Sequence, residues 1–136
     1  IVAVPDIPIK VESFHGNFVV VPRIALDRIG GIDGDYEHAY ADFDLALRLR
    51  KAGVNLLLLP FIVGFCSPNF SDRNQRTLIS QLNFLRSKKG RPLKSQFRYM
   101  RRHGPPILWI FFVFSPYLHT LIKGIFNALG IRRWTN

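Results

Sequence analysis

The sequence predicts an α/β domain that is followed by a helical extension. A helical apolar pattern over 42–52 lies between short apolar segments of strand length, which is typical of an α/β domain. The charge also changes along the chain: residues 1 to 60 hold eight acids and six bases, whereas residues 61 to 136 hold one acid and thirteen bases. We therefore expect two parts, residues 1–70 and residues 71–136.

Length and composition exclude several classes of protein. A chain of 136 residues with 48% apolar side chains is long enough for one domain with a core, and 13% aromatic residues argue against disorder. Because Cys66 is the single cysteine, a disulfide-framed secreted scaffold is excluded. The formal charge of +10 indicates an anionic partner. The opening Ile1 to Pro5 has no features of a signal peptide and reads like the interior of a longer protein.

The first elements are short. The β-branched run over 19–21, stopped by Pro22, predicts a buried strand. A helical turn is expected over 23–29, because Gly30-Gly31 supplies a stop. The stretch over 32–40 is rich in Asp, Gly and Tyr without apolar periodicity, so we expect a loop there.

The clearest helix covers 42–52, and Gly53 ends it. Its apolar stripe consists of Leu45, Leu49 and Ala52. The segments 54–59 and 61–65 around Pro60 are expected to be buried strands.

The extension is predicted to be helical. Helices are expected over 72–88 and 95–102, and Gly104-Pro105-Pro106 ends the second. The apolar run over 107–114 would rise about 12 Å as a helix, well short of the ~30 Å hydrocarbon core of a bilayer. After Ser115-Pro116, apolar residues fall on one face of an amphipathic helix. We therefore expect no membrane span here.

The densest group of ionisable residues runs from Asp33 to Asp44. Asp42 and Asp44 point about 200° apart on a helix, so they cannot form one paired site. Asp44 has Arg48 four residues on, which favours a structural ion pair. Asp42 is either a helix-start acid that stabilises the helix by about 0.5 to 2 kcal/mol, or a general base that takes a proton from a hydroxyl.

Four pieces of the chain, in order and spacing, resemble the acceptor-side half of family 2 glycosyltransferases, which have the GT-A (Rossmann-like) fold. They are His15 to Arg23, Ile29 to Asp33, His38 to Arg48, and Lys51 to Gly53. Later pieces look like the tail of one bacterial branch of that family: Gly64 to Asn69, Lys89 to Pro92, and Ser115 to Tyr117. The resemblance implies a partial GT-A domain over 1–70, followed by the helical extension.

The resemblance implies an inverting transfer in which Asp42 is the catalytic base that activates an acceptor hydroxyl of a glycan or of a lipid-linked molecule. The family usually has Glu-Asp at the positions of Ala41-Asp42, so here the base is present and the supporting Glu is replaced. The expected substrate-binding residues are Gly16, Asn17, His38 and Asp44.

Each of these contacts has a structural alternative. Gly16-Asn17 offers a close backbone approach and an amide for a sugar, or simply a turn into a strand. His15 and His38 are metal or phosphate contacts, or satisfied structural residues. Cys66 is expected to be an inert core thiol.

The donor half that the resemblance implies is not among these residues. It would carry an Asp-x-Asp motif for a divalent metal (Mg or Mn) and the nucleotide-sugar donor. Asp33-Gly34-Asp35 comes after the Gly30-Gly31 turn, so by order it belongs to the acceptor loop. We therefore expect the metal site upstream of this chain, the missing N-terminal half as a partner, and an inactive isolated chain.

Eight bases lie between Arg86 and Arg102. The expected phosphate or membrane contacts among them are Lys88, Lys89, Arg91, Arg101 and Arg102. These bases have three possible roles: a solvated face, contact with a diphosphate, or part of an interfacial membrane anchor. The anchor is suggested by Trp109 and Tyr117, which follow the bases, and each base near anionic lipid would contribute about 1 kcal/mol. The last option suits a cytoplasmic enzyme at the inner face of the membrane. In the interpretation that competes with a membrane anchor, the amphipathic helix packs on the missing N-terminal half.

The main rival hypothesis is a non-enzymatic basic module that binds nucleic acid or an anionic membrane. The aromatics cluster in one apolar segment and do not interleave with the bases, so we expect no nucleic acid partner. The run Gln75 to Leu78 does not complete the Gln-x-x-Arg-Trp signature of processive synthases, which disfavours a polymer synthase.

Overall fold

The computed structural model describes residues 6–37, 39–65, 77–88 and 90–128. The chain divides into two compact units. The described residues of the first unit are 6–35 and 40–65, and those of the second are 36–37, 39, 77–88 and 90–128. His38, Cys66 and Lys89, for which we made predictions above, lie outside the described residues.

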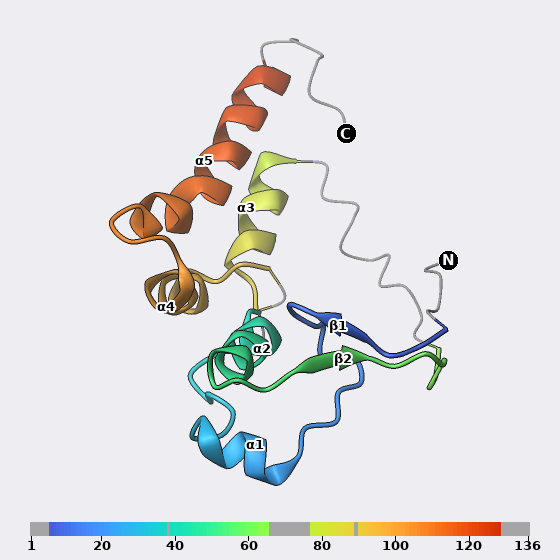
Figure 1. Cartoon of the computed structure of the whole chain (residues 1–136). Coiled ribbons are helices and arrows are strands. Elements are labelled where there is room, and N and C mark those ends of the chain that lie inside the picture. Colours follow the sequence, from blue (N-terminus) through green and yellow to red (C-terminus); the bar gives the residue numbers. More distant parts are fainter. Residues whose placement is uncertain (1–5, 38, 66–76, 89, 129–136) are drawn as a thin grey trace. The chain divides into compact units, whose positions relative to one another are not determined.

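The first unit combines a small sheet with two helices (Figure 1). Strand β1 (Ile9–Val11) pairs antiparallel with β2 (Leu56–Leu58), so that Ile9 lies opposite Leu58 and Val11 opposite Leu56. Helix α1 spans Arg23–Arg28 and α2 spans Ala41–Lys51. The buried core consists of Ala25, Leu45, Ala46, Leu49 and Leu56. Strand β1 has no counterpart among the elements predicted from the sequence.

Both helices of this unit form where the sequence predicts them. Helix α1 is followed by Gly30 and Gly31 at φ 73° and 81°, a left-handed backbone that glycine adopts without steric cost. The expected loop over 32–40 is confirmed for its described residues. Helix α2 begins one residue earlier than predicted and ends before Gly53, which also has a positive φ. Its predicted stripe is partly wrong, because Ala52 is exposed.

The strand predictions of this unit are largely wrong. Residues 19–21 form no strand, and Val20 is exposed. The segment over 54–59 contains only the three residues of β2, and 61–65 is an exposed segment without strand structure. A strand needs a partner for its backbone groups, and among the described residues only β1 and β2 pair in this way.

The second unit is helical, with α3 (Leu78–Arg86), α4 (Leu93–His103) and α5 (Trp109–Ala128). Helix α4 confirms the prediction over 95–102. Helix α3 starts at a capping box in which Thr77 Oγ1 accepts from the Ser80 amide and Ser80 Oγ accepts from the Thr77 amide. The helix was predicted to begin at residue 72, but residues 72–76 lie outside the described residues. Helix α5 packs against both α3 and α4 (Figure 1).

Helix α5 corrects the prediction of two separate short segments, because it continues through Pro116. Proline has no backbone N–H, so the carbonyl of Phe112, four residues earlier, loses its helical donor. Gln96 of α4 replaces that donor: its Nε2 lies 2.9 Å from the Phe112 oxygen, and Ser115 Oγ lies 3.2 Å from the same oxygen.

Because α5 is continuous, it is longer than either of the two segments predicted from the sequence. Twenty residues rise about 30 Å. By length and composition, Trp109–Asn127 is long enough and apolar enough to cross a bilayer. The expectation that the segment is too short to span is therefore wrong.

Candidate active site around Asp42

Asp42 lies in the first turn of α2, in the first unit, with 26% of its side chain exposed. The residue at the N-cap, Tyr40, has φ 72°, in the left-handed region that non-glycine residues seldom occupy. Such backbone conformations cost about 1 to 3 kcal/mol and cluster at functional sites. The chain thus enters α2 through a costly turn immediately before the predicted base.

Both oxygens of the Asp42 carboxylate accept a backbone hydrogen bond. The Gly16 amide donates to Oδ2 over 3.0 Å, and the Phe43 amide donates to Oδ1 over 2.9 Å. An ionised carboxylate has about four acceptor positions, so two bonds leave capacity for a hydroxyl. The carboxylate is thus held in place and is still partly open to solvent.

Gly16 lies close to Asp42 for a steric reason. A Cβ at residue 16 would stand 3.3 Å from Asp42 Cβ, tighter than ordinary van der Waals contact. The absence of a side chain therefore allows this backbone to reach the carboxylate. The two residues are 26 positions apart, and the sequence put them in one site only through the family resemblance. Asn17 follows Gly16 in the same turn and is exposed.

His15 is a neighbour of Asp42 that sequence reasoning did not pair with it. Its Nδ1 lies 3.7 Å from Asp42 Oδ2, outside hydrogen-bond distance, and its side chain is 78% exposed. The ring packs edge-on against Phe43, with centroids 5.0 Å apart and an interplanar angle of 72°. The imidazole therefore lies at the rim of the carboxylate.

Asp44 forms the ion pair that its spacing predicts. Its Oδ2 lies 2.7 Å from Arg48 Nε, with 0% of the Asp44 side chain exposed. Arg48 Nη1 also donates to the carbonyl oxygens of Ile29 and Gly31, over 2.9 and 2.8 Å. The pair therefore fastens α2 to the turn after α1. Substrate contact by Asp44 stays a prediction, and the buried pair accounts for the residue without it.

The acidic loop before α2 has its own local structure. Asp33 Oδ1 accepts from the Asp35 amide over 3.1 Å, which is an Asx-type turn. Within the described residues, no three or more His, Cys, Asp or Glu side chains are grouped so that they could hold a metal ion. The expected divalent metal therefore has no ligand set to assign here.

The basic residues singled out from the sequence belong to the second unit. Lys88, Arg91, Arg101 and Arg102 are all exposed. The carbonyl of Arg91 accepts a 2.6 Å hydrogen bond from the Tyr117 hydroxyl, which ties the start of α4 to α5. Contact of these four basic residues with phosphate or membrane stays a prediction.

The observed architecture is general. A two-stranded sheet with two helices occurs in many folds, so the partial GT-A assignment stays a prediction. Comparisons with protein-family models, with curated proteins and with solved structures found no match for this chain.

Proposed function

We propose that this chain is the acceptor-side part of a nucleotide-sugar-dependent, inverting glycosyltransferase in which Asp42 is the general base. The observation that carries the proposal is the Asp42 carboxylate, partly exposed at the start of α2 and held by the Gly16 amide. The ordered resemblance between His15 and Gly53 supports the same assignment.

In this reaction Asp42 has one role, that of the general base. As the acceptor hydroxyl oxygen forms a bond to the anomeric carbon, a carboxylate oxygen takes the hydroxyl proton. The bond between the anomeric carbon and the donor phosphate breaks, and the nucleoside diphosphate leaves with the electron pair. Attack from the face opposite the leaving group inverts the configuration. A fixed carboxylate suits this task because the base must be in place before the oxygen attacks.

The replacement of the family's Glu by Ala41 requires another support for the base. In this chain the Gly16 amide is hydrogen-bonded to Oδ2, and the His15 ring is beside it. We assign Gly16 as a positioning residue. Gly16 acts through its backbone, and no substrate contact is needed for that role.

The donor half and its divalent metal belong to a part of the enzyme that is not among these residues. When bound, the metal would stabilise charge on the leaving diphosphate. No step attributed to Asp42 depends on it.

The test is Asp42→Asn in the full-length protein. An amide cannot take the proton, so kcat is expected to fall by roughly 10² to 10⁴, with little change in thermal stability. Asp27→Asn is the matched control, because Asp27 is an exposed acid of α1 in the same unit. The anomeric configuration of the product, read by NMR, should be inverted.

Two results would contradict the proposal. Turnover by Asp42→Asn within about twofold of the parent protein would remove the base assignment. A product with retained configuration would remove the inverting mechanism even if Asp42 proved essential.

A further inference from the structure

Helix α5 has two different faces. One face packs within the second unit: Val113 is buried, and Gly124 lies so close to Leu78 of α3 that a Cβ would stand 2.6 Å from its Cδ1. The other face is an exposed apolar stripe, with exposed fractions from 41% to 69%. It consists of Phe111, Phe114, Leu118, Leu121, Ile122 and Ile125. Apart from the adjacent Leu121 and Ile122, successive positions are three or four residues apart, so the stripe runs along one side of the helix.

The apolar surface continues at the corner between α4 and α5. Ile107 and Leu108 are exposed there, and Phe97 of α4 packs edge-on against Trp109 with ring centroids 5.0 Å apart. Ile107 has φ 68°, which a β-branched residue rarely adopts. Both Phe97 and the first turns of α5 therefore contribute to the same exposed apolar region.

A basic stripe lies on α4, the helix that also carries Phe97. Lys94, Arg98 and Arg101 follow each other at i, i+4 and i+7, and Arg102 adjoins them. The described residues of the second unit contain eight Lys and Arg side chains and one acid, Glu37. An anionic surface would thus meet almost no repulsion from the described part of this unit.

We propose that the second unit is an in-plane anchor for anionic membranes. The stripe of α5 enters the boundary between headgroups and acyl chains, and the bases of α4 lie among the lipid phosphates. The proposal stands on this unit alone and does not depend on glycosyl transfer by Asp42.

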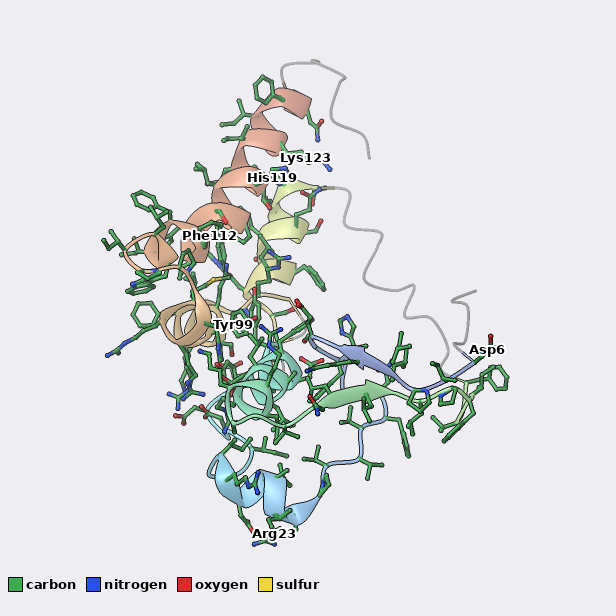
Figure 2. All side chains as sticks on the ribbon, viewed as in Figure 1. Asp6, Arg23, Tyr99, Phe112, His119 and Lys123 are labelled. Atoms are coloured by element: carbon green, nitrogen blue, oxygen red, sulfur yellow. The ribbon has the colours of Figure 1, made fainter. Side chains whose placement is uncertain are left out.

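The surroundings of α5 favour an in-plane position over a span, although the helix is long enough for both. Helix α3 packs along α5 and carries Asn83 and Arg86, and Lys123 lies on the side of α5 toward α3 (Figure 2). A span would carry these polar and charged groups into hydrocarbon, which is costly. An in-plane helix leaves them on the side toward water.

The binding test uses the 136-residue chain and extruded vesicles of phosphatidylcholine alone or with 30% phosphatidylglycerol. Flotation should recover the chain with the anionic vesicles and much less with the neutral ones. Binding should weaken as salt rises, because the phosphate contacts are screened.

Two sets of variants separate the apolar and the charged contributions. Phe114→Ala and Leu118→Ala should each lower the partition coefficient by roughly tenfold. Lys94→Gln and Arg101→Gln should each lower it by roughly fivefold. Ile24→Ala and Lys10→Gln, at exposed sites of the first unit, are the matched controls and should leave it unchanged. Circular dichroism checks that each variant keeps its helices.

Depth measurements separate an in-plane helix from a span. With Trp109 and Trp134 replaced by Phe, Phe111→Trp, Leu118→Trp and Ile125→Trp each place one reporter on the stripe. Quenching by brominated lipids should give one shallow depth for all three positions. The outer two are about 21 Å apart along the helix, so a span would put the central reporter deepest.

Several outcomes would overturn the proposal. A central reporter deeper than both ends would make α5 a span. Salt-sensitive binding to single-stranded oligonucleotides without vesicle binding would assign the charge to nucleic acid. Self-association through the stripe, again without vesicle binding, would assign the apolar face to a second copy of the chain.

Discussion

Replacement of Arg48 by Met removes one buried ion pair, and the hydrogen bonds that accompany it, from the unit that holds Asp42. Arg48 Nε lies 2.7 Å from Asp44 Oδ2, with 16% and 0% of the two side chains exposed. Met fills similar space but leaves the Asp44 charge buried without its partner, which costs about 3 to 5 kcal/mol. The carbonyl oxygens of Ile29 and Gly31 also lose a donor.

The chain contains a matched control in the same unit. Arg23 Nε lies 2.8 Å from Asp27 Oδ1, also at i, i+4, but 87% and 59% of these side chains are exposed, and Arg23 projects from α1 (Figure 2). Arg23→Met should therefore cost no more than about 0.5 kcal/mol. Both substitutions remove an i, i+4 ion pair, but Arg48→Met also removes the bonds to the Ile29 and Gly31 carbonyls. The difference between them therefore reports burial of the pair together with those two hydrogen bonds.

Native-state hydrogen exchange at the Leu49 amide in α2 measures the effect within this unit. Arg48→Met should speed exchange by more than about a hundredfold, and Arg23→Met by less than about threefold. Adding Asp44→Leu to Arg48→Met should recover much of the loss, because the buried charge is then gone. Equal effects of the two single variants, or no recovery in the double variant, would refute the reasoning.

Two further predictions concern the packing of α5. Gln96→Leu should cost about 1 kcal/mol, because the Phe112 carbonyl loses its Gln96 donor and keeps only the longer bond from Ser115 Oγ. The cost should be almost nothing when Pro116→Ala restores a backbone donor, as a double-mutant cycle of urea unfolding can measure. Gly124→Ala should cost a net ~1 kcal/mol, since crowding against Leu78 exceeds the gain in helix propensity. Leu78→Ala in the same chain should reduce that cost of crowding, and thermal unfolding of the four proteins would show whether it does.

Helix α2 was predictable because the residues that specify it are close together in the sequence. The spacing of Leu45 and Leu49 marks the buried face, and Gly53 marks the end. The Asp44–Arg48 pair also follows from helix geometry, which puts residues four apart side by side. The sequence therefore placed Asp42 correctly in the first turn of α2.

The errors share a different cause. The β-branched run over 19–21 has the composition of a strand, but pairing depends on what lies beside it. The break expected at Pro116 failed because a side chain from α4 supplies the missing hydrogen bond. The proximity of His15 to Asp42 likewise depends on the fold, and no local pattern encodes it.

The hydrogen bond from Gln96 to the Phe112 carbonyl also has a consequence for the order of folding. Helices usually obtain every main-chain bond from their own turns, whereas α5 takes one from a neighbour. A synthetic α5 peptide would lack that donor and should fray around Phe112. Because α4 precedes α5 in the chain, it can form first during synthesis and then serve as a template on which the turn at Pro116 closes. The two helices should therefore gain protection from exchange together, as one cooperative step.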